Sequence, residues 1–496
     1  MRESGILLPI SSLPSPYGIG CFSKEAYEFV DQLALANQKY WQILPLGPTS
    51  YGDSPYQSFS TYAGNPYFID LNTLIEKGVL TKKECDLADF GSDSRFIDYG
   101  KLYKARYKLL RKAYERSNIS KNPEFQTFQE ENAWWLDDYA LFMAVKGFFQ
   151  DECWDKWPED IKKRYGYALD YYREQLYFEI EFQKYMQFEF SIQWKKLKAY
   201  ANENGIRIIG DIPIYVAYDS ADTWAHPELF QLDEENVPLA VAGCPPDGFA
   251  ADGQLWGNPL YRWDYHRQTG YAWWMQRLSY AFYLYDVVRI DHFRGFDEYF
   301  SIPYGDTTAR NGHWEKGPGI ELFRRMKEVL GERDVIAEDL GYVTDSVRQM
   351  VFESGFPGMK VFEFAFDSRD TGCAGDYLPH NYPVNSVVYT GTHDNATLIG
   401  WYQDIPKEGR EMLRDYIHDY VTSDRSLHWS VICRVMGSPA RICMIPMQDY
   451  LGLDNTCRIN TPSTLGTNWK WRLLDGEFTS DLQNKIKKLV RIYQRN

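Results

Sequence analysis

Short runs of apolar and β-branched residues recur along the chain, and most of them end at or beside a proline, a glycine or an acidic residue. Such runs are typical of parallel strands that are buried on both faces. Helix-like segments lie between the later runs, for example at 319–330 and 345–354. Buried strands that alternate with helices predict an α/β fold, here a (β/α)8 TIM barrel. The eight runs are residues 5–9, 40–45, 206–211, 287–291, 335–338, 359–364, 386–390 and 441–446.

The spacing of the runs is uneven. About 160 residues separate the second run from the third, whereas a plain strand–helix–strand unit needs roughly 30. The intervening stretch is rich in Tyr, Trp, Lys and Glu and has the hydrophobic period of helices. We therefore predict a large helical insertion at 74–193, with the catalytic barrel built from 1–73 and 194–496. Residues 226–274 are dense in Gly, Pro and aromatic residues, which predicts a long loop region that closes over the active site.

The fourth run, Val287-Val288-Arg289-Ile290-Asp291, places two charges at the end of an apolar strand. Side chains alternate along a strand, so Arg289 and Asp291 point in the same direction. Two buried charges are costly unless they are paired or used. In α/β barrels, the carboxyl ends of the strands are where ligands bind. The charges therefore belong either to a functional site or to an ion pair that merely closes the strand.

Acidic residues also stand at other strand ends, namely Asp211, Glu338 and Asp394. A single such acid often caps the next helix. Acids from four strands, however, are expected to converge on one barrel mouth, where like charges raise one another's pKa. Oxygen ligands of this kind can also hold a divalent cation. Because no second set of ligands is evident, we expect no metal.

Converging carboxyls suit the cleavage of glycosidic bonds with retention. That reaction needs two carboxyls roughly 5 Å apart, one to attack the anomeric carbon and one to protonate the leaving oxygen. Arg289 would keep Asp291 ionised as the nucleophile, while neighbouring carboxylates would raise the pKa of Glu338 so that it holds a proton. Asp394 and the preceding His393 would hold sugar hydroxyls. The alternative for His393 is a hydrogen-bonded histidine of the core.

Composition limits the partners. Aromatic residues make up 17% of the chain, with 16 Trp, 38 Tyr and 28 Phe, and an excess of flat rings favours a carbohydrate ligand. The net charge of −15 argues against nucleic acids and anionic membranes. The eight cysteines include no C-x-x-C pair, and no apolar stretch is long enough to span a bilayer. We expect a cytoplasmic protein. Phosphate-binding, dinucleotide-binding and metalloprotease motifs are absent from the sequence, so we expect no cofactor.

Together these motifs resemble the 4-alpha-glucanotransferases. This is glycoside hydrolase family 77, which contains bacterial amylomaltases and plant disproportionating enzymes and is related to the α-amylases. The resemblance covers essentially the whole chain. Its motifs are Tyr51-Gly52-Asp53-Ser54-Pro55-Tyr56-Gln57-Ser58, Gly210-Asp211-Ile212-Pro213, Pro245-Pro246-Asp247, Gly253-Gln254-Leu255-Trp256-Gly257-Asn258-Pro259, Val288-Arg289-Ile290-Asp291-His292-Phe293-Arg294-Gly295, Ala337-Glu338-Asp339-Leu340-Gly341, Tyr389-Thr390-Gly391-Thr392-His393-Asp394-Asn395, Arg458-Ile459-Asn460-Thr461-Pro462 and Asn468-Trp469.

The resemblance implies specific roles. Asp291 would be the nucleophile, Glu338 the acid/base, and Asp394 a third carboxylate that stabilises the transition state. The residues expected to bind substrate are Tyr56, Asp211, Trp256, Arg289, His292, His393 and Asn460, with Trp256 in the loop over the acceptor. Tyr51 matches a tyrosine that stacks on glucan at a second site in some members, with Tyr99 as its suggested partner. The alternative for Tyr51 is a packing tyrosine in a turn.

Two differences from related sequences matter. Some family members carry an aromatic residue after Pro-Pro-Asp, where this chain has Gly248 followed by Phe249. A glycine cannot stack on a sugar, so that lid contact and any preference for long or cyclic products are not predicted. The α-amylases end their third-strand motif in Asn-His, whereas this chain has Gly210-Asp211-Ile212-Pro213-Ile214-Tyr215. The residue that would help bind their calcium is therefore missing, and we infer no required calcium.

Transfer and hydrolysis share the glycosyl-enzyme intermediate and differ in what attacks it. A transferase must exclude water and bind an acceptor glucan. The aromatic loop with Phe249, Trp256, Tyr261 and Trp263 suits that role, although it is also compatible with an ordinary packed loop. We predict disproportionation of maltooligosaccharides, amylose or glycogen-derived α-1,4-glucans. The alternatives are an α-1,4-glucan hydrolase and a non-catalytic glucan-binding protein. The sequence leaves the oligomeric state open.

Overall fold

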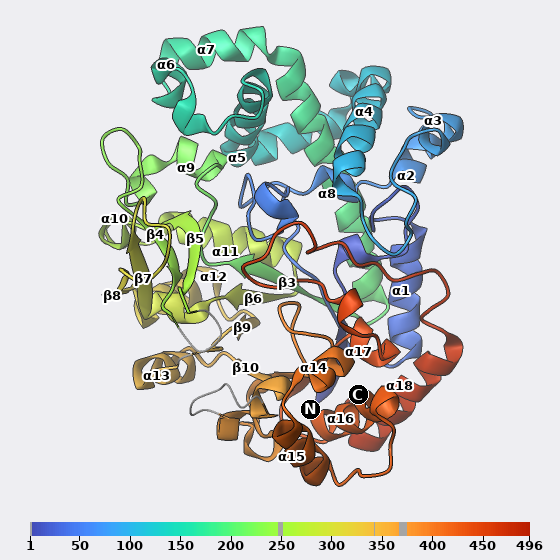
Figure 1. Cartoon of the computed structure of the whole chain (residues 1–496). Helices are drawn as coiled ribbons and strands as arrows, with labels where there is room; N and C mark the ends of the chain where they lie inside the picture. Colours follow the sequence, from blue (N-terminus) through green and yellow to red (C-terminus); the bar gives the residue numbers. More distant parts are fainter. Residues whose placement is uncertain (1, 247–250, 342, 367–373) are drawn as a thin grey trace.

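Eight parallel strands close into a barrel in the computed structural model, which describes residues 2–246, 251–341, 343–366 and 374–496 and leaves the side chain of Tyr51 undescribed (Figure 1). Each strand falls on one of the eight apolar runs, so the predicted (β/α)8 barrel is confirmed. In order around the barrel the strands are β1 (Glu3–Leu7), β12 (Ile442–Pro446), β11 (Ser386–Tyr389), β10 (Gly358–Val361), β9 (Val335–Ala337), β6 (Val287–Asp291), β3 (Arg207–Pro213) and β2 (Tyr40–Gln42).

Helices surround the barrel. Their apolar sides pack on strands whose residues are almost all buried, which is why the strands read as continuous apolar runs. Around the barrel, α1 packs beside α8 and α18, and α11 packs beside α12. These outer helices are α1 (Lys24–Leu35), α10 (Trp263–Gln268), α11 (Ala272–Leu284), α12 (Ile320–Leu330), α13 (Asp345–Ser354), α14 (Leu398–Asp404), α15 (Lys407–Ile417), α16 (Leu427–Met436), α17 (Met447–Leu451) and α18 (Ser480–Tyr493).

The long segment between β2 and β3 is helical. The helices α4 to α7 lie at one end of the molecule, away from α15 (Figure 1). A tryptophan-rich core that includes Trp135, Trp154 and Trp157 joins this segment to Trp224 of α9 (Ala221–Ala225). The other helices of the segment are α2 (Leu71–Glu76), α3 (Lys82–Asp86), α4 (Tyr99–Ser117), α5 (Pro123–Phe148), α6 (Glu159–Lys162), α7 (Gly166–Gln175) and α8 (Tyr177–Glu203).

Helix α8 runs across the expected boundary at 193/194. Its residues Phe190 and Trp194 both pack on Phe22 near the start of the chain, with ring centroids 5.2 and 5.4 Å from that ring. One continuous helix therefore serves the insertion and the barrel. We keep 74–193 as the inserted unit and 1–73 with 194–496 as the barrel as a proposed division, with α8 shared between them.

A second sheet lies beside the barrel. Within the described ranges it has four antiparallel strands in the order β5 (Gln254–Pro259), β4 (Ala240–Cys244), β7 (Glu298–Pro303) and β8 (His313–Lys316). Strands β4 and β5 fall inside 226–274, which we expected to be a loop region over the active site. The sheet also recruits β7 and β8, so the segments before and after β6 are held together on one side of the mouth.

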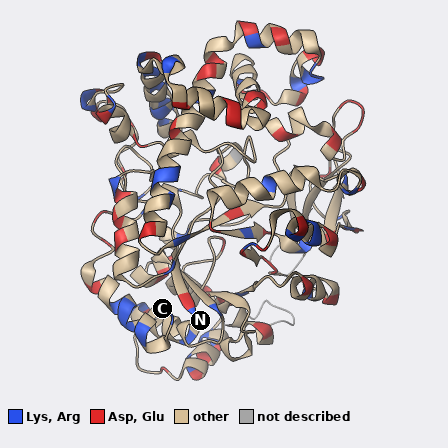
Figure 2. Ribbon diagram, turned by 180° about the vertical axis from the view of Figure 1, so that it is seen from behind, with Lys and Arg blue, Asp and Glu red and all other residues tan. Residues whose placement is uncertain are grey.

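The surface carries charges of both signs, and no disulfide links the described cysteines. Acidic and basic residues are interspersed over the outer helices (Figure 2). The cysteines in the described part of the chain are all free thiols. No helix among the described residues has both the length and the apolar character needed to cross a membrane.

Candidate active site

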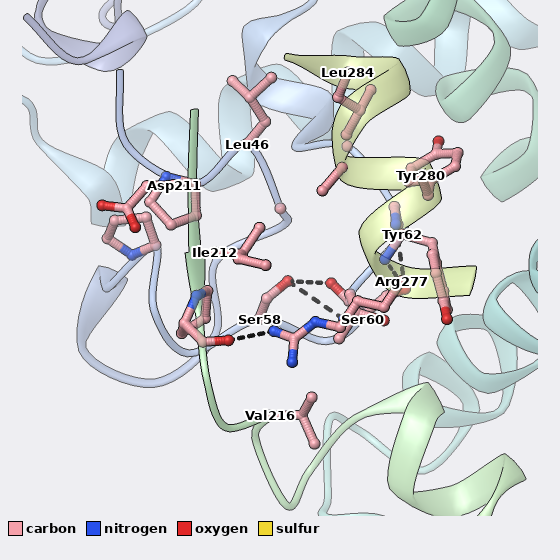
Figure 3. Close-up of a pocket in the computed structure, with 18 of the residues that line it drawn as sticks. Leu46, Ser58, Ser60, Tyr62, Asp211, Ile212, Val216, Arg277, Tyr280 and Leu284 are labelled. Carbon is pink, nitrogen blue, oxygen red and sulfur yellow. Dashed lines mark hydrogen bonds between the residues drawn. The ribbon is translucent and has the colours of Figure 1, made fainter. Parts of the chain in front are cut away.

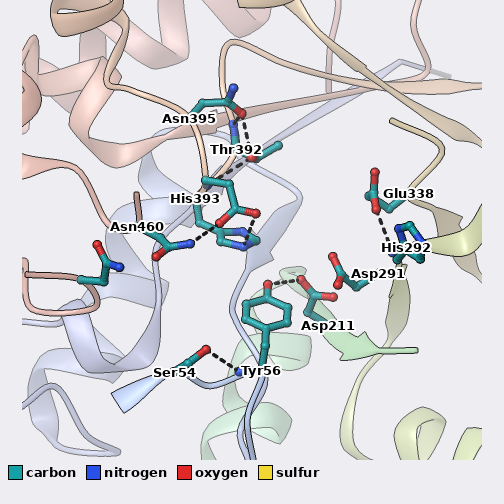
Figure 4. A network of polar contacts seen from close by, with 12 residues as sticks. Ser54, Tyr56, Asp211, Asp291, His292, Glu338, Thr392, His393, Asn395 and Asn460 are labelled. Carbon is teal, nitrogen blue, oxygen red and sulfur yellow. Dashed lines mark hydrogen bonds and ion pairs between the residues drawn. The ribbon is translucent and has the colours of Figure 1, made fainter. Parts of the chain in front are cut away.

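The carboxyl ends of neighbouring parallel strands bring the predicted catalytic side chains to one mouth of the barrel (Figure 4). In the register, Asp211 of β3 lies opposite Arg289 of β6, and Pro213 lies opposite Asp291. Glu338 directly follows β9, which pairs with β6. His393 and Asp394 lie on the loop that follows β11. Four strands therefore contribute to one site, as the sequence predicts.

Arg289 is the central cation of the site. Its side chain is 3% exposed, and one of its nitrogens, Nη1, donates to both carboxylate oxygens of Asp211, at 2.8 and 2.7 Å, and to Oδ1 of Asp291 at 2.9 Å. From the sequence we paired Arg289 with Asp291 alone. Asp211, which is buried on the adjacent strand, is its second partner. Burial lowers the pKa of Arg289, but the two carboxylates raise that pKa well above its ordinary value.

The pKa of Asp291 is subject to opposing effects. Burial raises the pKa of its carboxyl, Arg289 lowers it, and the charges of Asp211 and Asp394 raise it, with a net rise to about 6. The Arg289 contact therefore acts in the predicted direction without returning the pKa to its ordinary value. At neutral pH, Asp291 is still mainly ionised and free to act as a nucleophile.

Glu338 lies against the turn that follows Asp291. Its Oε2 accepts a hydrogen bond from the backbone N–H of His292 at 2.7 Å, and its Oε1 accepts one from the N–H of Leu340 at 2.9 Å. His292 has a left-handed backbone, with φ of 53°, which turns this N–H toward Glu338. Burial and then the charge of Asp291 raise the pKa of Glu338 to about 7. The sequence prediction of a proton-holding carboxyl is consistent with this environment.

Asp394 has a different environment. Nε2 of His393 lies 3.2 Å from Oδ2 of Asp394. The side-chain amide of Asn460 donates to Oδ1 of Asp394 at 2.6 Å. Burial raises the pKa of Asp394, but His393 and Asn460 outweigh it and lower the pKa to about 2. The Asp394 side chain is 42% exposed, so its charge faces the mouth. The pKa of His393 is correspondingly raised, because Asp394 outweighs the effect of burial.

Tyr56 contacts both Asp211 and His393, the histidine that lies beside Asp394. Its hydroxyl donates to Oδ2 of Asp211 at 2.8 Å, and its ring stacks on His393 with centroids 5.1 Å apart and an interplanar angle of 16°. Both contacts orient Tyr56 and His393 toward the mouth. This stack was not predicted, because Tyr56 and His393 are far apart in the sequence and only the barrel brings them together.

The second sheet reaches the mouth through Trp256 on β5. Its ring and that of His292 form a T-shaped pair, with centroids 4.9 Å apart and an interplanar angle of 88°. Burial, and then the nearby Arg294, lower the pKa of His292 to about 3, so its ring is neutral. In the described part of the chain, Nε2 of His292 has no hydrogen-bond partner. A neutral ring nitrogen with unused hydrogen-bonding capacity therefore lies beside Asp291 and Glu338.

Other predicted residues have different outcomes. Asp247, Gly248 and Phe249 of the proposed lid lie outside the described residues, as does the side chain of Tyr51. Tyr99 is buried, and its hydroxyl donates to the carbonyl of Trp469 at 2.8 Å. Tyr99 is thus mostly covered and bound to the backbone, and its pairing with Tyr51 stays a prediction.

Arg458 is a site residue to which the sequence assigned no role. Its guanidinium donates to the backbone carbonyls of Asp394 and Asn460. The signal was its position two residues before Asn460 in a motif of the resemblance.

A small cavity lies behind Asp211 (Figure 3). Its volume is about 50 Å³, room for water but far below the ~300 Å³ of a small ligand site. It is lined by Tyr56, Ser58, Tyr62, Arg277, Tyr280 and Leu284 among others. Arg277 of α11 donates to the carbonyl of Ile214 at 2.9 Å and so braces the end of β3.

The carboxylates are engaged by protein donors rather than arranged around a shared point. Asp211 binds Arg289 and Tyr56, Glu338 binds two backbone amides, and Asp394 binds His393 and Asn460. Among the described residues, no cluster of His, Cys, Asp and Glu side chains has the arrangement of a metal site.

Comparisons with known proteins agree with this geometry. A family model described as 4-alpha-glucanotransferase matches residues 8–477. The chain is 50% identical to the 4-alpha-glucanotransferase of Clostridium butyricum, over 98% of this chain and 99% of that protein. It is 45% identical to the enzyme of Thermus thermophilus, over 100% and 99% of the two chains. The amylomaltase of Streptococcus agalactiae in complex with acarbose has a TM-score of 0.96 and 41% identity, with both chains fully covered.

We predict that Arg289→Met destabilises the fold. The change leaves Asp211 buried without its cation, and breaking a buried ion pair costs about 3–5 kcal/mol. Denaturant unfolding monitored by tryptophan fluorescence measures the loss. In the double variant Arg289→Met/Asp211→Asn, much of the stability returns, because no unpaired charge remains at Asp211. A single variant as stable as the wild type would contradict this account of the pair.

Proposed function

This chain belongs to the 4-alpha-glucanotransferase family, and we propose that it transfers segments of α-1,4-glucan from a donor chain to the 4-hydroxyl of an acceptor glucan or glucose. The observation that carries the proposed mechanism is the coupling of Asp291 and Glu338. The residue after Asp291 donates its N–H to Glu338, so one backbone turn positions both carboxyls. The full-length similarity to 4-alpha-glucanotransferases supports a transferase over a hydrolase or a silent binding protein.

The first step forms a glycosyl-enzyme. The Asp291 carboxylate attacks the anomeric carbon, and the bond from that carbon to the leaving O4 breaks. The proton of Glu338 passes to O4, so the shortened glucan leaves with a free 4-hydroxyl. Glu338 has the raised pKa that this role needs, because its burial and the charge of Asp291 favour its protonated form.

The second step transfers the segment. Glu338, now a carboxylate, takes the proton of an acceptor 4-hydroxyl, and that oxygen attacks the anomeric carbon. The ester bond to Asp291 breaks, and the nucleophile is regenerated. Each displacement inverts the anomeric centre, so the two together retain the α configuration.

The other mouth residues would hold the sugar at the bond to be cleaved. Asp394 keeps its negative charge at neutral pH and is suited to hydroxyls of the distorted ring, where its hydrogen bonds strengthen in the transition state. His393, His292 and Arg289 would contribute further contacts. Tyr56, Asp211 and Asn460 contact these groups directly, so their effect on substrate would pass partly through them.

Selection of an acceptor over water would fall to the second sheet. Trp256 stands on β5 beside His292, at the edge of the catalytic carboxyls. A flat ring at that place suits a glucan on the acceptor side and would exclude water from the intermediate. The second glucan site at Tyr51 stays a prediction. We also propose a cytoplasmic location, supported by the free thiols of the described cysteines.

Incubation with pure maltotriose tests the function. We expect glucose together with maltopentaose and longer chains, because each donor gives part of itself to another sugar. Chromatography of the products measures the ladder. Asp291→Asn should abolish it. Glucose and maltose with no longer products would show a hydrolase, and no turnover at all would show a binding protein.

The pH dependence of kcat/KM follows from the two carboxyls. Activity should fall as the pH drops through about 6, where Asp291 gains a proton and ceases to be a nucleophile. It should fall again as the pH rises through about 7, where Glu338 loses the proton that the leaving group needs. A bell-shaped profile between these limits is expected from initial rates of maltotriose consumption.

A donor whose leaving group needs no proton separates the two limbs. With maltotriosyl fluoride, the alkaline limb of kcat/KM should disappear while the acidic limb stays. An alkaline limb that persists with the fluoride would contradict the assignment of Glu338 as the acid.

A further inference from the structure

The loop that presents His393 and Asp394 is braced within itself. It joins β11 to α14 across residues 390–397. The side chain of Asn395 accepts hydrogen bonds from the N–H and the hydroxyl of Thr392, at 2.9 and 2.8 Å. The hydroxyl of Thr392 in turn accepts a hydrogen bond from the N–H of Asp394 at 3.2 Å. The turn is therefore held in shape by its own side chains, while its placement over the mouth depends on contacts with the segments around it.

Asp449 holds both ends of this loop. It lies on α17, directly after β12, and is 2% exposed. Its Oδ2 accepts a hydrogen bond from the hydroxyl of Thr390 at 2.5 Å, at the start of the loop. Its Oδ1 accepts one from the N–H of Leu398 at 2.7 Å, at the end of the loop. One carboxylate thus closes the two ends of the segment against the neighbouring strand.

We propose that Asp449 is a positioning residue for the transfer reaction, because its carboxylate sets the place of the loop that carries His393 and Asp394. Asp449 touches neither of these side chains among its described contacts, so it acts through the backbone of the loop. The inference rests on the proposed function, since it assigns these two residues to the reacting sugar.

The surroundings of Asp449 argue against a purely electrostatic role. No ion pair to it exists in the described part of the chain, and burial raises the pKa of its carboxyl to about 6 although both hydrogen bonds lower it. A buried carboxylate without a cation is costly to keep. The two hydrogen bonds partly offset this cost, and both donors lie at the ends of the loop that carries His393 and Asp394.

A neighbouring side chain supports the same segment. Asn455 accepts a hydrogen bond from the N–H of Thr397 at 3.1 Å and donates to Asp404 at 2.7 Å. A Cβ on Gly400 would lie 2.1 Å from the Asn455 side chain, so α14 needs glycine there to approach. The chain after β12 therefore contacts the end of the loop through Asn455, and Asp449 contacts both ends of it.

Three substitutions separate positioning from stability. Asp449→Leu keeps the approximate shape and removes both acceptors, and Thr390→Val removes one donor with no change of shape. Asp449→Asn is the conservative variant, because its oxygen can accept from Leu398 while its amide donates to the hydroxyl of Thr390. The control is Asp70→Leu, since Asp70 is also buried and accepts from the hydroxyl and the N–H of Thr73, away from this loop.

Initial rates with maltotriose, taken well below each variant's thermal midpoint, give kcat and KM. We expect kcat to fall roughly 10- to 100-fold in Asp449→Leu and Thr390→Val, as small displacements of catalytic groups do, with little change in KM. Asp449→Asn should retain kcat near the wild type, and Asp70→Leu should lower only the thermal midpoint. Thr390→Val alone decides the matter if Asp449→Leu does not fold.

Several results would overturn the inference. Wild-type kcat in folded Thr390→Val would do so, as would Asp449→Asn as impaired as Asp449→Leu. An equal loss of kcat in Asp70→Leu would show general destabilisation instead. A wild type that yields no maltooligosaccharide ladder would overturn the proposed function itself, and this inference with it.

Discussion

The buried guanidinium of Arg289 is the constraint on which the site depends. It lies between the carboxylates of Asp211 and Asp291, within 2.9 Å of each, and is almost fully excluded from solvent. A charge of this kind is tolerated only where partners compensate it. The β3–β6 register supplies those partners by placing Asp211 opposite Arg289. The same arrangement leaves one carboxylate, that of Asp291, partly exposed at the mouth, with a cation on one side and the proton-holding Glu338 on the other.

Much of the fold could be predicted because barrel strands are buried on both faces and leave continuous apolar runs. All eight runs became strands, and the acids at their ends met at one mouth because parallel strands share a carboxyl edge. The second sheet could not be predicted in this way. Its strand β5 is partly exposed, and its strand β4 pairs with β7, which lies beyond β6 in the sequence. Similarly, neither the Arg289–Asp211 pair nor the Tyr56–His393 stack can be found without the register between strands. The sequence of one strand shows which of its side chains alternate between faces, but it does not show which residues of the neighbouring strand lie opposite them.

The groups that position the side chains of the site come from different parts of the chain. The turn after β6 joins Asp291 to Glu338 through one backbone N–H. The segment after β12 supports the loop after β11, through Asp449 at its ends and through Asn460 and Arg458 near its tip. Because these supports act on different groups, the carboxyls at the mouth have different environments and different pKa values. In the proposed mechanism, that difference would let one carboxyl attack while another gives and takes a proton.

A covalent intermediate on Asp291 is the central claim, and trapping it is the most direct test. In Glu338→Gln, maltotriosyl fluoride can still react with Asp291, because fluoride leaves without a proton, but the intermediate lacks a base to activate the acceptor. Mass spectrometry of digested protein should then find one maltotriosyl group on the peptide that contains Asp291. The double variant Glu338→Gln/Asp291→Asn should carry none. An adduct on another residue, or the same adduct in the double variant, would contradict the account.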